Sequence, residues 1–193
     1  VPLEKQNVDT GMGLDRVVAV LNGHRSVYDT EFFTGMFEVI GKSQEILSGE
    51  ELRQARIIVD HVRASVFIAG DGVEPSNKER GYILRRLLRR SMVYARTLNL
   101  QGEWLKALVG KVMAEYSDAY PELIQNNDKI FALLETEQKK FGTTVEKGLK
   151  EFGKMFETQG QLSGTDAFNL YQSYGFPLEL TEELAVAAGQ EIN

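Results

Sequence analysis

Residues 71–90 read DGVEPSNKERGYILRRLLRR, and this stretch joins a loop to a strongly patterned helix. Its first residues include glycine, proline, serine and asparagine, which predict a loop over 70–77. Over 79–98 the apolar residues recur at intervals of three and four, which predicts a helix with one buried face. Four arginines lie on the flank and back of that face and form a stripe: Arg85, Arg86, Arg89 and Arg90.

The charge of this region differs from that of the rest of the chain. Between Pro75 and Arg96, seven basic residues stand against the single acidic Glu79, whereas the whole chain has a net charge of −6. A basic block on an acidic protein indicates a local site for a polyanion. A solvated helix face explains the same pattern, and charge alone leaves the two interpretations open.

Length and composition limit the classes of protein that fit. The chain has 193 residues, of which 42% are hydrophobic and 26% charged, as in a globular protein of one or two domains. The absence of cysteine excludes disulfides and thiolate chemistry, and two histidines are too few for a histidine-rich metal centre. No apolar run approaches the roughly 20 residues that span a bilayer, and no leader pattern is present. We therefore expect a cytoplasmic protein without a membrane partner.

The remaining periodicity predicts a mainly α fold. Helices are expected over 14–21, 52–69 and 104–116, with one long helix or two stacked helices over 124–156. Ser163 and Asp166 have the spacing of a capping box, which predicts a helix from there to about residue 172. Thr181 is expected to cap the last helix.

The N-terminal residues have a different pattern. Residues 6–10 resemble a strand that runs into a glycine turn, and a lone strand needs a neighbouring sheet to satisfy its backbone. Gly11, Gly13 and Arg16 then open a helix, but no Gly-Lys-Ser/Thr follows, so a P-loop is excluded. Two interpretations remain: a tight strand–helix turn, or an anion site where Arg16 binds a phosphate and Asp9 an ammonium group. His61, between Asp60 and Arg63, is interpreted as a structural histidine rather than a catalytic one.

Several blocks of the chain resemble the class II aminoacyl-tRNA synthetases, in the form found in the alanyl-tRNA synthetase family. Residues 8–17 (VDTGMGLDRV) resemble motif 3 of that class. The blocks that follow occur in the family's order: 28–30 (YDT), 60–63 (DHVR), 71–77 (DGVEPSN), 80–90 (RGYILRRLLRR), 167–168 (AF) and 174–181 (YGFPLELT).

This resemblance implies an architecture and a function. Residues 1–45 would be the end of a class II α/β catalytic domain, with a remnant strand–helix, and residues 46–193 a helical-bundle middle domain that binds the tRNA acceptor stem. The full-length enzyme would ligate alanine to tRNA(Ala) using ATP with Mg²⁺. The first two class II motifs would lie upstream. The oligomerisation module and the editing domain, which holds zinc, would lie downstream. We therefore expect this piece to be monomeric and inactive alone.

The resemblance also implies residue roles. Asp9 and Gly11 would bind alanine, and Arg16 would bind ATP. Asn77 would read the G·U wobble pair of the acceptor stem, and the arginine helix would run along the stem backbone. Side chains expected to contact tRNA are Asn77, Arg80, Arg85, Arg86, Arg89, Arg90 and Gln172.

The chain departs from the family pattern at Gln172, where the family has an aspartate that also reads the wobble pair. A glutamine amide both donates and accepts hydrogen bonds, whereas a carboxylate only accepts. We therefore expect altered or relaxed reading of that pair. Two alternatives stay open beside the synthetase interpretation: a non-catalytic helical scaffold that binds another protein, and an intact enzyme whose N-terminus is misinterpreted.

Overall fold

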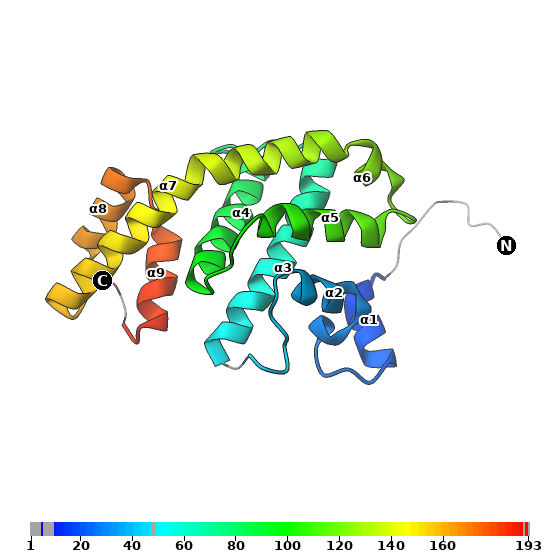
Figure 1. The fold of residues 1–193 in the computed structure, drawn as a ribbon, viewed down its shortest axis with the longest axis horizontal. Helices are drawn as coiled ribbons and strands as arrows, with labels where there is room; N and C mark the ends of the chain where they lie inside the picture. Colours follow the sequence, from blue (N-terminus) through cyan, green and yellow to red (C-terminus); the bar gives the residue numbers. More distant parts are fainter. Residues whose placement is uncertain (1–4, 6–9, 48, 191, 193) are drawn as a thin grey trace.

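The computed structural model describes residues 5, 10–47, 49–190 and 192 (Figure 1). Within these ranges the regular structure is entirely helical. The elements are α1 (Leu14–Leu21), the short 3-10 helix η1 (Val27–Asp29), α2 (Glu31–Val39), α3 (Gly49–Gly70), α4 (Glu79–Thr97), α5 (Trp104–Tyr116), α6 (Pro121–Gln125), α7 (Asn127–Gln159), α8 (Gly164–Tyr174) and α9 (Leu178–Ala187).

The mainly α prediction is confirmed for the described residues. Helices α1, α4 and α5 have the expected positions, and α7 is one continuous helix of 33 residues rather than two. The expected strand over 6–10 is not shown, because residues 6–9 lie outside the described residues and Thr10 has no regular structure. The remnant strand–helix therefore stays a prediction. Helix α2 was not predicted from the sequence.

The two predicted helix caps have different outcomes. The capping box before α8 is confirmed: the Asp166 N–H donates to Ser163 Oγ (3.2 Å), and the Ser163 N–H donates to Asp166 Oδ2 (3.0 Å). The cap at Thr181 is wrong, because α9 already begins after Pro177, whose extended backbone precedes the first turn. Thr181 is buried inside that helix, and its hydroxyl donates to the Pro177 carbonyl (3.3 Å).

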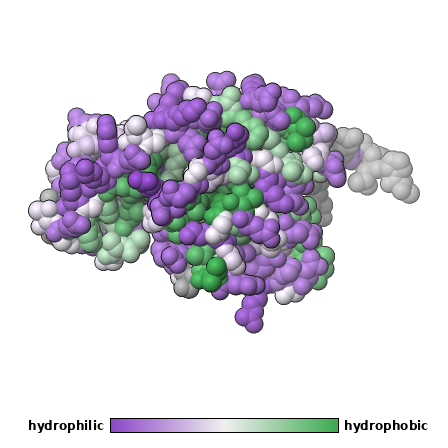
Figure 2. All heavy atoms as spheres, viewed as in Figure 1, coloured by the Kyte–Doolittle hydropathy of each residue, from purple (hydrophilic) through white to green (hydrophobic). Residues whose placement is uncertain are grey.

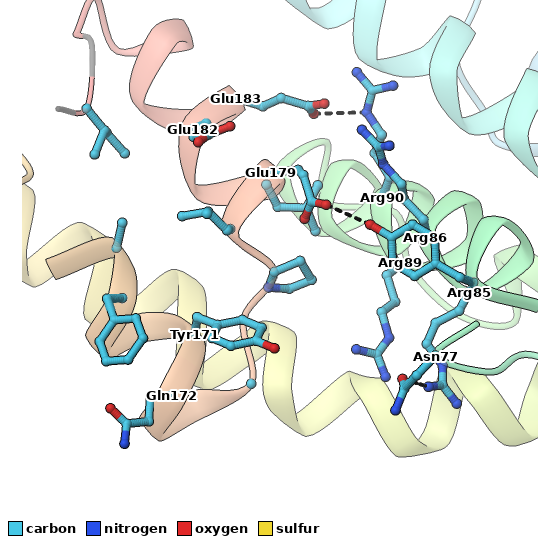
Figure 3. A pocket seen from close by; sticks show the side chains of 18 of the residues that line it. Asn77, Arg85, Arg86, Arg89, Arg90, Tyr171, Gln172, Glu179, Glu182 and Glu183 are labelled. Carbon is cyan, nitrogen blue, oxygen red and sulfur yellow. Dashed lines mark hydrogen bonds and ion pairs between the residues drawn. The ribbon is translucent and has the colours of Figure 1, made fainter. Parts of the chain in front are cut away.

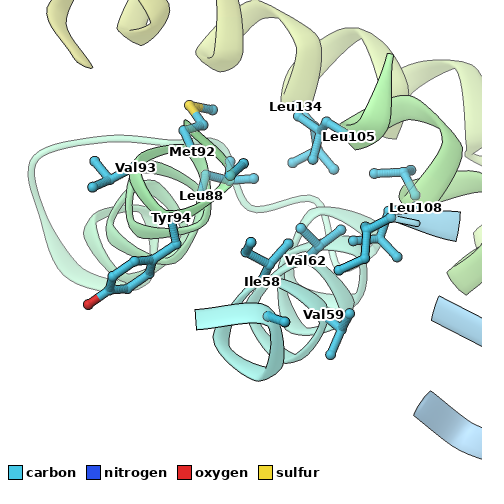
Figure 4. Packing of buried hydrophobic residues seen from close by; sticks show 14 of the residues in the cluster. Ile58, Val59, Val62, Leu88, Met92, Val93, Tyr94, Leu105, Leu108 and Leu134 are labelled. Atoms are coloured by element: carbon cyan, nitrogen blue, oxygen red, sulfur yellow. The ribbon is translucent and has the colours of Figure 1, made fainter. Parts of the chain in front are cut away.

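The hydrophobic core lies where α3 and α4 pack against each other and against α5 and α7 (Figure 4). Ile58 on α3, Leu88 on α4, Leu108 on α5 and Leu134 on α7 are all fully buried there. The same cluster includes three residues of α2: Phe33, Met36 and Phe37. The core therefore contains residues from both sides of the predicted domain boundary, which follows residue 45. The division into two domains stays a prediction.

Helix α7 connects this core to the C-terminal helices, crossing from α6 at one end of the molecule to α8 and α9 at the other (Figure 1). Phe176, in the turn between α8 and α9, is completely buried against α7 at Gly148. A Cβ atom at Gly148 would overlap the Phe176 ring, so only glycine permits this approach. The contact holds the turn between α8 and α9 against α7. A groove lies between α4 on one side and α8 and α9 on the other.

Candidate nucleic-acid interface

A groove of about 1110 Å³ separates α4 from α8 and α9 (Figure 3). This volume exceeds the roughly 300–1,000 Å³ of typical small-molecule pockets. Side chains of α4 form one wall, and side chains of α8 and α9 form the other. The polar and aromatic lining residues are Asn77, Tyr82, Arg85, Arg86, Arg89, Arg90, Phe168, Tyr171, Gln172, Glu179, Glu182 and Glu183.

The loop before α4 folds back onto the first turn of that helix. The Ser76 N–H donates to the Gly81 carbonyl (3.0 Å), and Ser76 Oγ accepts from the Lys78 N–H (3.2 Å). A Cβ atom at Gly81 would overlap Ser76 and the Glu74 carbonyl oxygen, so glycine is required for this packing. The loop is therefore pinned to α4 directly beside Asn77.

Asn77 and Arg85 meet at the mouth of the groove (Figure 3). Arg85 Nη1 donates to Asn77 Oδ1, and Arg85 Nη2 donates to the Pro75 carbonyl (3.2 Å). A guanidinium has only donors, so the amide oxygen of Asn77 must face Arg85 and the amide nitrogen must face away. No hydrogen-bond partner of that nitrogen is found among the described residues.

A buried carboxylate on α7 holds two arginines of the stripe. Glu137 is 3% exposed. Arg89 Nε donates to its Oε1 (2.9 Å), and Arg85 Nε lies 3.3 Å from the same oxygen. The Arg89 guanidinium also lies over the Phe141 ring, 4.4 Å from its centroid. A buried carboxylate is tolerated only when it is paired, and here two cations share one anion, which leaves the cluster with one net positive charge.

Arg90 takes part in a separate polar network that links α4 to α9 and α3. Arg90 Nε donates to Glu183 Oε2 (2.9 Å), and its Nη1 lies 3.2 Å from His61 Nε2. The Tyr94 hydroxyl donates to the same Glu183 oxygen (2.7 Å) and accepts from Arg53 (3.0 Å). Burial, followed by the bond to Glu183, raises the pKa of Tyr94. His61 is also 3.1 Å from Asp60 Oδ2, so it is a hydrogen-bonded residue of this network, as expected; that it has no catalytic role stays a prediction.

A second contact between the walls is more exposed. The Tyr82 hydroxyl on α4 donates to Glu179 Oε1 on α9 (2.7 Å). This bond lowers the pKa of Glu179 from its ordinary value of 4.5 and raises the pKa of Tyr82 above 10.0. Among the described residues, α4 and α9 are therefore joined at the rim by the Tyr82–Glu179 bond and deeper in the structure by Glu183, which accepts from both Arg90 and Tyr94.

The α8 wall presents aromatic rings and an amide. Phe168 and Tyr171 are 57% and 58% exposed, which is unusual for side chains of this size. Gln172 follows them, is exposed, and has no hydrogen-bond partner within the described ranges. Exposed rings opposite guanidinium groups are typical of nucleic-acid-binding surfaces, because bases stack on aromatic faces.

Six of the seven side chains expected to contact tRNA line this groove. Arg80 does not: it is exposed on the first turn of α4 outside the lining. The expected stripe of four similar guanidiniums differs from the structure, because Arg85, Arg89 and Arg90 are engaged with Glu137 and Glu183. Arg86 is exposed, and no hydrogen bond or ion pair of its side chain is found in the part of the chain that the structure describes.

Two of the N-terminal residues expected to bind alanine and ATP, Gly11 and Arg16, lie away from the groove. Gly11 and Arg16 are exposed at the start of α1, at the opposite end of the molecule from α8 (Figure 1). Asp9 lies outside the described residues. Asp15 of α1 forms an ion pair with Arg63 of α3 (2.6 Å), which attaches this helix to the core. The structure therefore does not bring these residues together with the groove.

Metal ligands and membrane spans are absent from the described residues. No group of three or more histidine, aspartate or glutamate side chains is arranged to hold a metal ion there. No helix in these ranges is long and apolar enough to cross a membrane. Hydrophilic residues cover most of the face in Figure 2, with apolar patches between them.

Sequence reasoning missed several residues that shape the groove, and for three of them the sequence holds a signal. Glu137 lies three residues after Leu134 and four before Phe141, at a position of α7 where the spacing predicts a buried apolar residue. A charged residue at such a position indicates a buried ion pair. Phe168 and Tyr171 stand three apart on α8, and that spacing places both rings on one helix face.

Comparisons with known proteins agree with the sequence resemblance. The model of the family "tRNA synthetases class II (A)" matches residues 1–193. An alanine–tRNA ligase of Treponema pallidum is 45% identical over all of this chain, and one of Desulfitobacterium hafniense is 40% identical over all of it. An alanine–tRNA ligase of Elusimicrobium minutum is 38% identical over 98% of the chain. The chain spans 33%, 23% and 22% of the lengths of these relatives, respectively. The chain belongs to the class II (A) family of tRNA synthetases.

Proposed function

We propose that this chain binds the acceptor stem of a tRNA in the groove between α4 and α8–α9. The observation that carries the proposal is that the two facing walls of the groove present complementary kinds of side chain. Guanidinium groups and the Asn77 amide lie on one side, and the Phe168 and Tyr171 rings and the Gln172 amide lie on the other. The protein to which the chain belongs would ligate alanine to tRNA(Ala), the reaction named for its relatives.

The chemistry of the groove suits a folded RNA end. An RNA helix exposes a wide, shallow minor groove with base edges and 2′-hydroxyls, and a loop amide reaches such edges. Asn77 and Gln172, on opposite walls, would read the G·U wobble pair. Gln172 can accept from a base amino group, as the family's aspartate would, and it can also donate. Recognition through Gln172 is therefore expected to be less strict.

The ion pairs predict how many phosphates the stripe contacts. The cluster of Arg85, Arg89 and Glu137 keeps one positive charge, and Arg86 adds a second. Arg90 is neutralised by Glu183. Binding should thus release counterions equivalent to about two phosphate contacts from this stripe, rather than four.

The catalytic part of the proposal rests on the resemblance of residues 8–17 to motif 3 and on the names of the relatives. Class II synthetases use ATP with Mg²⁺ in general. In the full-length protein, the exposed Arg16 at the start of α1 would bind an ATP phosphate. Gly11 and Asp9 would bind alanine. The described residues contain no cluster of metal ligands, so no magnesium site is assigned to them.

A salt titration tests the proposal. An RNA minihelix carrying the acceptor stem of tRNA(Ala) is titrated into the 193-residue chain at several salt concentrations. Binding should weaken steeply with salt, and Arg86→Gln should reduce the slope of log K against log salt by about one. Lys106→Gln, a lysine on α5 whose side chain is 66% exposed, is the matched control and should leave the slope nearly unchanged. Absence of RNA affinity would refute the proposal and favour a protein-binding scaffold.

Base reading is tested separately with two stems that differ only in a G·U or a G–C pair. Asn77→Ala should reduce the preference for the G·U stem by roughly 1–3 kcal/mol, the value of one groove contact. Equal losses for both stems would show that Asn77 does not read the pair. Gln172→Asp should sharpen the preference, and an unchanged preference would remove this position from the reading site.

A further inference from the structure

Glu137 is a charged residue that contacts neither solvent nor the open part of the groove. It is 3% exposed, on the face of α7 that packs against α4. Its carboxylate lies within hydrogen-bond or ion-pair distance of two guanidiniums, Arg89 Nε at 2.9 Å and Arg85 Nε at 3.3 Å. Both of these arginines line the groove. Glu137 therefore determines where two groove side chains lie without lining the groove itself.

The same connection reaches Asn77. Arg85 Nε lies 3.3 Å from Glu137 Oε1 in an ion pair without a hydrogen bond, while Nη1 donates to Asn77 Oδ1 and Nη2 donates to the Pro75 carbonyl. The two hydrogen bonds at Nη1 and Nη2 orient the planar guanidinium, and attraction to the buried Glu137 carboxylate keeps it at this place in the groove wall. One lone pair of the Asn77 amide oxygen is thereby used, and the two N–H groups of the amide are directed away from Arg85.

We propose that Glu137 is a positioning residue: through Arg85 it holds the Asn77 amide so that this group meets an RNA ligand as a hydrogen-bond donor. The atom that Asn77 recognises is then an acceptor, such as a base carbonyl oxygen or ring nitrogen. A donor on the ligand, such as a base amino group, would have to share the Asn77 oxygen with the Arg85 guanidinium. The inference rests on the proposed RNA binding and adds to it the direction of the hydrogen bond.

Two substitutions at Glu137 separate its charge from its reach. Glu137→Gln keeps the shape and removes the charge, and Glu137→Asp keeps the charge and shortens the side chain. Each should reduce the preference for the G·U stem over the G–C stem by roughly tenfold, comparable to the loss of one groove contact. Glu137→Asp also serves if Glu137→Gln fails to fold. Glu146→Gln, on the same helix in an exposed pair with Arg96 at 3.7 Å, is the matched control and should keep the preference.

A purely structural role for Glu137 predicts a different result, namely weaker binding of both stems with an unchanged ratio. A double-mutant comparison makes the distinction sharper. If Glu137 acts through Asn77, then Asn77→Ala combined with Glu137→Asp should discriminate no worse than Asn77→Ala alone. Asn77→Asp, which can still accept from Arg85 but has no N–H, should lose the preference as fully as Asn77→Ala.

The outcomes distinguish this inference from the proposed function. If the unmodified chain binds neither stem, the proposed function fails and the inference fails with it. If it binds both stems equally, acceptor-stem binding stands, but reading of the G·U pair fails and the inference fails with it. If the unmodified chain prefers the G·U stem and Asn77→Ala abolishes that preference, the proposed function stands. Full preference in both Glu137 variants, or in Asn77→Asp, would then overturn the inference alone.

Discussion

The two walls of the groove are held in place by different interactions: the α4 wall by the buried carboxylate of Glu137, and the α8–α9 wall by the buried ring of Phe176. Glu137 supports Arg85 and Arg89 from α7, and it is 3% exposed. Phe176 anchors the other wall against Gly148 of the same helix and is completely buried. Helix α7 is therefore the common base on which both walls are built.

The difference between the two supports follows from what each wall presents. An ion pair fixes the direction of a polar side chain, so the α4 wall can offer guanidinium and amide groups in a defined orientation. Apolar packing fixes the position of a helix but does not direct the polar groups on its surface. Gln172 and the rings of the α8 wall are accordingly exposed and free of internal hydrogen bonds among the described residues.

The largest expected effect comes from removing the charge beneath the α4 wall. Glu137→Leu leaves Arg85 and Arg89 beside an apolar residue, and we expect it to lower the free energy of unfolding by about 3 kcal/mol. Urea unfolding monitored by circular dichroism measures this change. Glu146→Leu removes an exposed carboxylate from the same helix and should cost about 0.5 kcal/mol or less. Equal effects of the two substitutions would mean that the buried pair does not support the wall.

A smaller effect is expected from the apolar support of the second wall. Gly148→Ala places a Cβ atom where the Phe176 ring lies, and overpacking of this kind costs about 1–3 kcal/mol. Gly142→Ala on the same helix is the control. It meets no atom within 4 Å and should stabilise the helix by about 0.5–1 kcal/mol. Thermal unfolding of both variants tests the contrast, which would disappear if both alanines stabilised the protein.

The smallest effect is expected at the rim, where Tyr82 and Glu179 join the walls. Tyr82→Phe removes this solvent-exposed bond and should cost about 0.5 kcal/mol at neutral pH. Because the bond lowers the pKa of Glu179 from 4.5, its contribution is present above that pH and is lost as the pH falls through the lowered pKa. It also raises the pKa of Tyr82 above 10.0, so the contribution is lost again as the pH rises through that value.

Urea unfolding of the unmodified chain and of Tyr82→Phe at a series of pH values measures this dependence. The stability difference should be largest between about pH 6 and pH 9 and should decrease as the pH falls through the lowered pKa of Glu179. A difference that is constant across this series would show that the hydroxyl does not interact with the Glu179 carboxylate.

The sequence predicts the α4 wall well because local rules determine it. The loop over 71–77 and the helix after it follow from turn residues and from a spacing of three and four, and α4 begins at Glu79 as expected. The box at Ser163 follows from a four-residue pattern. The start of α9 was placed too late. Thr181 is a residue type that often caps helices, but the residue that precedes the first turn is Pro177, four residues earlier.

The partners of the arginines could not be predicted in the same way. Arg89 and Glu137 are 48 residues apart, and Arg90 and Glu183 are 93 residues apart, so their pairing depends on how α7 and α9 pack. Periodicity identifies the face on which a side chain lies but not the helix that it meets. The stripe was therefore located correctly, while the number of free charges on it was overestimated.

The most direct test of the account is a photocrosslink from inside the groove. Phe168→p-benzoylphenylalanine places a reactive ring on the α8 wall, where the native ring is 57% exposed. The same substitution at Val186, which is 65% exposed on α9 and does not line the groove, is the control. With the acceptor-stem minihelix bound, the account predicts a crosslink from position 168 and none from position 186. Equal crosslinking from both positions, or a crosslink from position 186 alone, would contradict binding of the RNA in this groove.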